Sequence, residues 1–177
     1  MDKKVHLKRG IGLSLALHGG GLTGAGEDRM GTKAQVEIDV NRDVISVHTS
    51  CTEMGQGVTT VLPMLAAEIF GVPLSKVECP LPDTSIVPDS GPTVASRTTM
   101  YVGKVVQDAS KKLILKIKKY LEMSINANFS YDNGVFKSKN KDISLFEASL
   151  LYCEGNGNCS KILAEAVYEP VAGYSWD

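Results

Sequence analysis

The sequence predicts an α+β fold in which helices are layered on a mixed or antiparallel sheet, and three observations support this. Residues 34–50 alternate between apolar and polar side chains across a short turn, which is typical of a β-hairpin. Residues 59–73 and 98–126 carry helical periodicity and helix end signals. No regular strand–helix alternation and no repeat of fixed period is present, which favours segregated layers. We expect residues 1–177 to form a single domain, because this length suffices for one hydrophobic core.

The expected strands begin with "GIGLSLALH", residues 10–18, whose alternation predicts a buried strand that leads into a glycine-rich loop. The hairpin follows, with its turn at 41–43. Four apolar side chains are expected on its buried face: Ala34, Val36, Ile38 and Val40. Further short strands are expected at 75–81, on both sides of the Asn133-Gly134 turn, and at 160–170.

The first expected helix lies within "TTVLPMLAAEIFGVP", residues 59–73, where threonines start it, Pro63 lies near its first turn and the final "GVP" stops it. The second, 98–126, carries an apolar stripe at a spacing of three or four residues. A short helix is expected at 144–152. Between the two long helices, residues 82–96 are rich in Pro, Asp, Ser, Thr and Gly and form either a long ordered loop or a disordered one.

Composition excludes several classes of partner. A formal net charge of −1, from 19 basic and 20 acidic residues, provides no field that would attract nucleic acid or an anionic membrane. No stretch approaches the roughly 20 apolar residues that span a bilayer. The apolar run near the N-terminus is broken by glycine and lacks a small-residue cleavage pattern, so we interpret it as a strand and not as a signal peptide. We therefore expect a cytoplasmic protein.

The cysteines and histidines do not predict a metal site. The four cysteines form no CxxC pair and have no histidine at zinc-ligand spacing, so we interpret them as structural thiols in a reduced compartment. They are Cys51, Cys79, Cys153 and Cys159. The three histidines are scattered singly, without the clustering that a protein metal site needs. No metal-ligating residue is expected.

Two glycine-containing or hydroxyl-rich loops are the candidate sites. "CTEMGQGVTT", residues 51–60, places two glycines around Gln56 at a strand-to-helix junction, where unpaired N–H groups and the helix dipole favour an anionic cofactor. "DSGPTVASRTT", residues 89–99, offers Ser96, Thr98 and Thr99 hydroxyls directly before the long helix. The two loops could converge on one anion. The alternatives left open are a tight structural turn for the first loop and ordinary helix capping for the second.

Other polar features of the sequence have structural explanations. "GGGLTGAGE", residues 19–27, lacks the GxGxxG spacing and the lysine of a P-loop, so it does not predict a nucleotide site. Glu53, Asp83 and Asp89 lie near the two candidate loops. Helix capping or turn formation is their default role, because nothing fixes a separation suited to acid–base chemistry.

The order of these motifs resembles the molybdenum-cofactor-binding subunit of the xanthine dehydrogenase and aldehyde oxidase family. "TEMGQG" precedes a helix that ends in "GVP", a short strand and "DT" follow, and "GPTVAS" leads into a long helix with Gly103. The resemblance covers roughly residues 9–122 and is weaker beyond them. It implies that the chain is a fragment of a larger α+β molybdopterin-binding region, a C-terminal-half piece of that region.

The resemblance also implies a cofactor and its contacts. Gly55, Gln56 and Gly57 match the loop that contacts molybdopterin, or its cytosine dinucleotide form. A second loop of the family lies beside the metal and the phosphate-bearing tail of the cofactor. The residues that match it here are Val94, Ala95, Ser96 and Thr98, with Ala95 closest to the metal. The pterin's dithiolene sulfurs hold the metal in this family, so no protein metal ligand is implied.

The family reaction is a water-derived hydroxylation of an aldehyde or a nitrogen heterocycle, a small-molecule substrate. The catalytic glutamate of the family lies in a "GxGE" segment near the end of the full subunit, and Glu27 in "GAGE" stands at the wrong end, so no catalytic residue is assigned. The implied partners are the rest of the molybdenum subunit and the iron–sulfur and FAD domains or subunits. The isolated chain is expected to be inactive.

An isolated fragment of this kind is also expected to self-associate through apolar surface that normally packs on the rest of the subunit. Two alternatives remain open. One is a non-catalytic cofactor-binding or assembly module derived from the same family. The other is a soluble domain with purely structural glycine loops, which mobility of residues 82–96 would favour.

Overall fold

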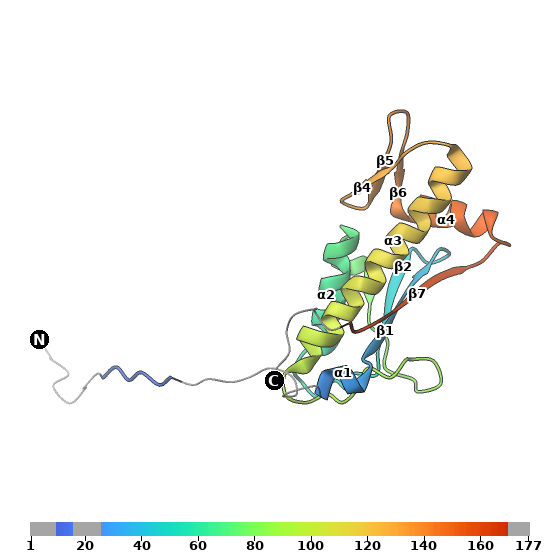
Figure 1. The fold of residues 1–177 in the computed structure, drawn as a ribbon. Coiled ribbons are helices and arrows are strands. Elements are labelled where there is room, and N and C mark those ends of the chain that lie inside the picture. The colour runs from blue at the N-terminus through green and yellow to red at the C-terminus, as the bar shows by residue number, and fades with distance from the viewer. Residues whose placement is uncertain (1–9, 16–25, 170–177) are drawn as a thin grey trace, which may run out of the picture.

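The computed structural model describes residues 10–15 and 26–169 (Figure 1). Its main sheet has four strands in the order β3-β2-β1-β7, and a second sheet has the order β4-β5-β6. The described elements are α1 (Gly26–Met30), β1 (Lys33–Asp39), β2 (Val44–His48), α2 (Val58–Phe70), η1 (Leu74–Lys76), β3 (Val77–Glu78), η2 (Thr98–Val102), α3 (Gly103–Ile125), β4 (Ser130–Asp132), β5 (Val135–Lys137), β6 (Asp142–Ser144), α4 (Leu145–Gly155) and β7 (Lys161–Val167). This is the α+β arrangement that the sequence predicts.

The predicted hairpin is confirmed as the centre of the main sheet. β1 and β2 are antiparallel, with Val36 opposite Val47 and Ile38 opposite Ile45. β7 pairs antiparallel with the other side of β1, and β3 pairs parallel with β2, so the sheet is mixed. The side chains of these two pairs are completely buried. Of the face expected from alternation, Ala34, Val36 and Ile38 are completely buried, while Val40 lies in the turn after β1 and is only partly buried.

Helices α2 and α3 cover that buried face (Figure 1). The apolar stripe predicted for the second helix is completely buried, at Val102, Val106, Ala109, Leu113 and Ile117. The two helices approach closely at Gly103, where an added Cβ would lie 2.7 Å from Leu65 Cδ1. Close packing against α2 therefore explains the glycine at the start of α3.

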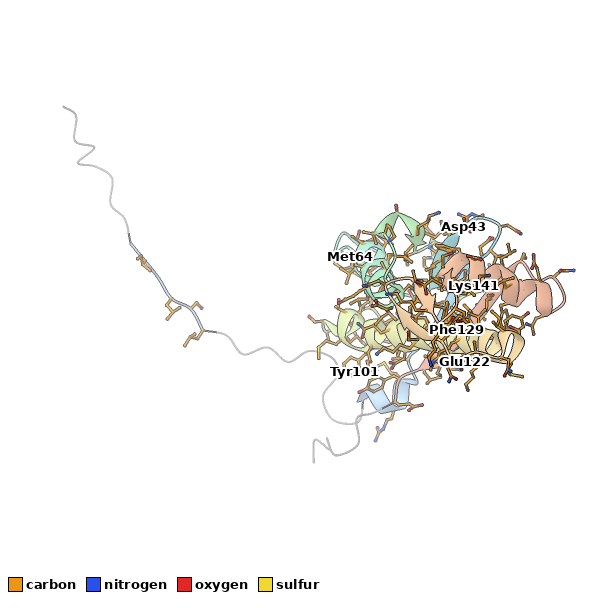
Figure 2. The ribbon with its side chains drawn as sticks, turned by 90° about the horizontal axis from the view of Figure 1, so that it is seen from above. Asp43, Met64, Tyr101, Glu122, Phe129 and Lys141 are labelled. Atoms are coloured by element: carbon orange, nitrogen blue, oxygen red, sulfur yellow. A yellow bond between two sulfur atoms is a disulfide. The ribbon has the colours of Figure 1, made fainter. Side chains whose placement is uncertain are left out.

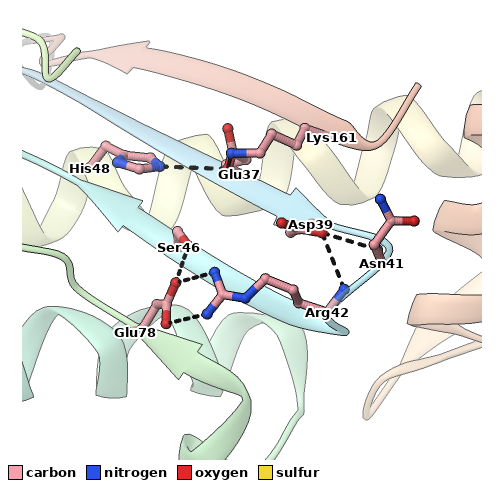
Figure 3. Close-up of polar contacts among 8 residues, drawn as sticks. All are labelled: Glu37, Asp39, Asn41, Arg42, Ser46, His48, Glu78 and Lys161. Atoms are coloured by element: carbon pink, nitrogen blue, oxygen red, sulfur yellow. Dashed lines mark hydrogen bonds and ion pairs between the residues drawn. The ribbon is translucent and has the colours of Figure 1, made fainter. Parts of the chain in front are cut away.

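The opposite face of the sheet is polar, and its charges are paired across the strands (Figure 3). Arg42 donates two hydrogen bonds of 3.0 Å to Glu78, which also accepts one of 2.9 Å from Ser46. Glu37 lies 2.9 Å from Lys161 Nζ and 3.9 Å from His48 Nε2. One apolar and one polar face is the pattern of a sheet covered by helices on one side only.

The second sheet and the C-terminal helix extend the core at the far end of α3 (Figure 1). The hairpin predicted around Asn133-Gly134 is confirmed, with Tyr131 opposite Phe136. Strand β6, which the sequence did not predict, places Ile143 opposite Phe136, and both are completely buried. No helix within the described ranges has the length and apolar character needed to cross a membrane.

Two expectations about the first half of the chain are wrong. Residues 10–15 of the expected strand 10–18 form no strand and lie exposed, and residues 16–18 lie outside the described residues. Alternation makes a segment able to pair, but a strand also needs a neighbour for its backbone groups, and none of the described strands pairs with this one. The first helix is present as α2, but it begins at Val58 with Gly57 as its N-cap and not at the threonines, so Pro63 lies in its second turn.

The interpretation of all four cysteines as free thiols is also wrong, because Cys153 and Cys159 form a disulfide. The chain turns back after α4, and the Cys159 N–H donates a 3.3 Å hydrogen bond to the Cys153 carbonyl. This turn brings together two cysteines whose spacing matches no common motif. Cys51 and Cys79 are free, and burial raises the pKa of both thiols, so they stay protonated and structural.

Candidate functional site

The two loops singled out in the sequence line one groove of about 560 Å³. This volume lies within the range of small-molecule and cofactor sites. The first loop contributes Met54 and Gln56, and the second contributes Thr93, Val94, Ala95, Ser96, Thr98, Thr99 and Met100. The predicted convergence of the loops is therefore present in the structure.

The first loop is shaped by Glu53, whose carboxylate binds the beginning of α2. It accepts hydrogen bonds from the N–H groups of Gly55 at 2.8 Å, Gly57 at 3.0 Å and Thr59 at 3.1 Å, and from the Thr59 hydroxyl at 3.0 Å. The bonds from Gly57, Thr59 and Gly55 lower the pKa of Glu53 to about 2. The expectation of an external anion at these amides is wrong, because an internal carboxylate already occupies them.

Gln56 is braced within the same loop. Its side-chain oxygen accepts a 2.7 Å hydrogen bond from the Met54 N–H, and its side-chain nitrogen donates one of 2.7 Å to the Thr52 carbonyl. Glycine on both sides permits the path of the loop, since Gly55 and Gly57 have φ of 101° and 84°. The loop therefore holds a fixed shape and presents Gln56 at the edge of the groove.

The second loop has an unusual backbone. Ala95 and Ser96 have φ of 50° and 55°, a left-handed conformation that costs non-glycine residues about 1–3 kcal/mol each. The helix that follows starts with a π-helical turn, and no side chain caps it. The alternative of ordinary capping is therefore wrong, and the hydroxyl-bearing side chains of Ser96, Thr98 and Thr99 line the groove.

Arg97 holds this loop from inside the protein. Its side chain is completely buried and donates hydrogen bonds of 2.9 Å to the carbonyls of Ser90 and Pro92, and one to the Thr32 hydroxyl. The guanidinium thus fixes both ends of the turn 90–97 against the residue that precedes β1. Such a network offsets the cost of the left-handed pair.

Serine and threonine hydroxyls tie the two loops together. The Ser50 N–H donates to Ser90 Oγ at 3.0 Å, and the Ser90 N–H donates to Ser50 Oγ at 2.8 Å. The Thr52 N–H donates to Thr93 Oγ1 at 3.0 Å. These bonds explain why a loop rich in turn residues is ordered, and they fix the width of the groove.

The predicted site residues divide into two groups. Five line the groove: Gln56, Val94, Ala95, Ser96 and Thr98. Gly55 and Gly57 do not line it and instead shape the first loop. Asp83 and Asp89 form turns, as their default role predicts, through bonds from the N–H groups of Ser85 and Gly91.

Sequence reasoning missed three lining residues and one central support. Met54, Thr93 and Met100 stand directly beside the predicted ones, so proximity to the motifs was the only available signal. Arg97 had no signal of its own, because a single arginine between small polar residues normally lies on the surface.

The groove suits a ligand that needs hydrogen bonds and carries its own metal ligands. Among its described lining residues, every side chain is uncharged, and none is a carboxylate, an imidazole or a thiol. Hydroxyls of the second loop can donate to or accept from a heterocycle or a phosphate, and Met54 and Met100 add apolar side chains to the lining. A pterin cofactor that holds metal through its own sulfurs fits this set of side chains.

Replacing Glu53 with glutamine is expected to destabilise the protein at neutral pH, because the ionised carboxylate accepts bonds from three backbone N–H groups. A folded-state pKa below the usual 4.5 means that this stabilisation is present above pH 4.5 and is lost as the pH falls towards about 2. Urea unfolding of both proteins should show a gap in midpoint at neutral pH that closes on acidification. A gap independent of pH would contradict this role for Glu53.

Comparison with known proteins agrees with the chemistry of the groove. The family model described as the molybdopterin cofactor-binding domain matches residues 1–174. Xanthine dehydrogenase of Dictyostelium discoideum is 33% identical over 122 residues, 69% of this chain and 9% of that protein. A probable xanthine dehydrogenase subunit of Bacillus subtilis (strain 168) is 29% identical over 114 residues, 64% of this chain and 15% of that protein. The chain thus matches less than a fifth of the length of each of these relatives.

Solved structures share the fold. CO dehydrogenase from Oligotropha carboxidovorans superposes with a TM-score of 0.68 at 19% identity, over 80% of this chain and 18% of that chain. Quinoline 2-oxidoreductase from Pseudomonas putida 86 gives a TM-score of 0.65 at 23% identity, over 79% of this chain and 19% of that one. With a family model that matches nearly every residue, the chain belongs to the molybdopterin cofactor-binding domain family of the xanthine dehydrogenases and aldehyde oxidoreductases.

Proposed function

We propose that this chain forms one wall of the molybdopterin site of a molybdenum hydroxylase. The observation that carries the proposal is the single groove lined jointly by the loop at Gln56 and the loop from Val94 to Thr98. Both loops are held by hydrogen bonds to other residues of this chain. A cofactor would therefore meet a wall whose shape is already established, which lowers the ordering cost of binding.

Each part of the wall has a specific role in this proposal. The hydroxyls of Ser96 and Thr98 would bind polar atoms of the pterin or its phosphate-bearing tail. The small side chain of Ala95, which lines the groove, would leave room for the metal end of the cofactor. The backbone of the loop from Gly55 to Gly57 would approach the cofactor closely, because two of its three residues carry no side chain.

When bound, molybdopterin supplies a metal that accepts two electrons while oxygen from water enters the substrate. The residues of this chain would orient the cofactor and exclude water from its polar edge. Relatives named xanthine dehydrogenase and aldehyde oxidoreductase support nitrogen heterocycles or aldehydes as the substrate class. Molybdopterin and its cytosine dinucleotide form would both offer a phosphate to the hydroxyls.

The remaining parts of the enzyme would come from other segments or other chains. The Bacillus subtilis relative is named a subunit, and this chain spans 15% of it. We include in the proposal the rest of the molybdenum subunit, which would supply the other cofactor contacts and a catalytic glutamate, and iron–sulfur and FAD domains or subunits as electron acceptors. Exposed apolar side chains at the groove, Met54, Val94 and Met100, would pack on such a partner or on the cofactor.

The proposal is tested by capturing the native polypeptide that carries this sequence from its source cell. Intact mass, molybdenum and pterin are measured on one sample, and products from a panel of aldehydes and heterocycles are analysed in ¹⁸O-labelled water. We expect a mass several times that of 177 residues, molybdenum with pterin, and label in a hydroxylated product. A free chain of this length that lacks both molybdenum and pterin would contradict the proposal.

A further inference from the structure

The outer edge of strand β7 carries backbone groups without a neighbouring strand among the described residues. The Tyr168 N–H donates to the Thr32 carbonyl at 2.8 Å, and the Val40 N–H donates to the Ser160 carbonyl at 3.0 Å. At both ends of β7, even-numbered residues therefore direct their backbone N–H and carbonyl groups towards β1. Because an antiparallel strand alternates its bonding direction, Leu163, Glu165 and Val167 direct their N–H and carbonyl groups outward.

Two lysines of α3 cover part of this edge. Lys112 donates a 3.2 Å hydrogen bond to the Glu165 carbonyl, and Lys116 donates one of 3.3 Å to the Leu163 carbonyl. Lysine is a common device for protecting a free sheet edge. These bonds are exposed and long, so a strand that brings its own N–H groups can replace them at small cost. The N–H groups of the edge receive nothing from a lysine, since an ammonium group only donates.

A hollow of about 310 Å³ lies beside the same edge, between α3 and the end of β7. Its lining combines Leu115 and Val167, which are 52% and 40% exposed, and Ala166 with four charged residues. The charged residues are Asp108, Lys111, Lys112 and Glu169, two of each sign. An added strand uses two features of such an edge: unpaired backbone groups for hydrogen bonds, and exposed apolar side chains for packing.

The chain itself contains a segment whose apolar alternation suits a strand added at this edge. Residues 10–15, "GIGLSL", place Ile11, Leu13 and Leu15 at every second position, and these side chains are 103%, 87% and 88% exposed. Figure 2 shows the segment extended in the open, away from the sheet. It carries no charge that the lysines of α3 would repel. Its alternation would direct three apolar side chains to one face of a strand.

We propose that residues 10–15 dock on the free edge of β7 as a fifth strand of the main sheet. Their backbone would bond to Leu163, Glu165 and Val167, and their apolar side chains would cover Leu115. The seventeen residues from 16 to 32 connect the segment to β1. Five of them form α1, and the other twelve span at most about 42 Å when extended, which is enough to reach the neighbouring strand. A tether of this length gives an effective concentration in the millimolar range, so the segment of the same chain is favoured over that of a second copy.

Amide hydrogen exchange measured by NMR on the full chain tests this docking. The amides of Leu163, Glu165 and Val167 are expected to exchange at least about tenfold more slowly than unbonded amides, at a rate independent of protein concentration. The amides of Ile162, Ala164 and Ala166 serve as an internal reference, because they face β1 in either case.

Two variants of the segment make the test specific. Leu13→Lys should abolish the protection of the three edge amides, while Ser14→Lys, on the opposite side of the strand, should retain it. Fast exchange of the edge amides in the unmodified chain would overturn the proposal. So would protection that appears only at high protein concentration, which would indicate a second copy, or protection that survives Leu13→Lys, which would indicate a different occupant.

Discussion

Replacing Arg97 with methionine is expected to lower the free energy of unfolding by about 3 kcal/mol or more, because it leaves buried acceptors without a donor. The lost partners are the carbonyls of Ser90 and Pro92 and the hydroxyl of Thr32. These bonds help to offset the left-handed conformation of Ala95 and Ser96, so their loss weakens the support of the loop. The groove wall is therefore expected to lose its shape, and molybdopterin retention should fall with stability.

Arg42→Met is the matched control for this change. Arg42 makes a bidentate pair with Glu78, yet its side chain is 56% exposed and screened by solvent, so its loss should destabilise the protein far less than the loss of Arg97. Urea unfolding of both variants and pterin content in the assembled protein give the comparison. Equal destabilisation by the two substitutions would show that burial of Arg97 does not organise the loop.

Gly57→Val is expected to remove most of the pterin from the assembled protein. Gly57 has φ of 84°, which a β-branched residue adopts only at a cost of about 1–3 kcal/mol, and it forms the N-cap of α2. Its N–H is also one of the groups held by Glu53, so a shifted backbone would release the loop that carries Gln56.

Gly157→Val separates the effect on the site from the effect on stability. Gly157 has φ of 81°, and an added Cβ meets nothing within 4 Å, which is also true of Gly57. Both substitutions place a β-branched residue at a positive φ without a steric clash, while only the one at Gly57 should lower the pterin content per folded protein. Equal pterin content in the two variants would rule out Gly57 as part of a cofactor loop.

Much of the fold follows from local sequence patterns. The central hairpin and the long helix were predictable because their apolar side chains repeat at periods of two and of three to four residues, and the sheet and the helices bury those faces against each other. Gly71 ends α2 in the predicted way, in a left-handed conformation that accommodates the turn. Strand β6 could not be predicted, because it is as short as β4 and β5 but has no Asn-Gly turn beside it.

Expectations failed where a distant partner decides the structure. Residues 10–15 do alternate between apolar and small or polar residues, but none of the described strands pairs with them. The Cys153–Cys159 disulfide depends on the turn after α4 and not on a motif. The anion expected at the start of α2 is the neighbouring carboxylate of Glu53, and the support of the second loop is a buried arginine. Such contacts join residues whose types alone do not reveal a partner.

The candidate loops were predictable as motifs, but their geometry was not. That Gln56 and Ala95 would line one groove depends on the bonds between Ser50 and Ser90 and between Thr52 and Thr93, which join residues about 40 positions apart. Only the structure shows that Gln56 lines the groove while Gly55 and Gly57 shape the loop.

The location of molybdenum in the native assembled protein tests the central proposal most directly. Crystals of that protein are measured on both sides of the molybdenum absorption edge, and an anomalous difference map locates the metal. We predict a single molybdenum peak at the groove, on the side of Ala95, with pterin density between the loop at Gln56 and the hydroxyls of Ser96 and Thr98. A molybdenum peak elsewhere, with this groove filled by protein side chains, would contradict it.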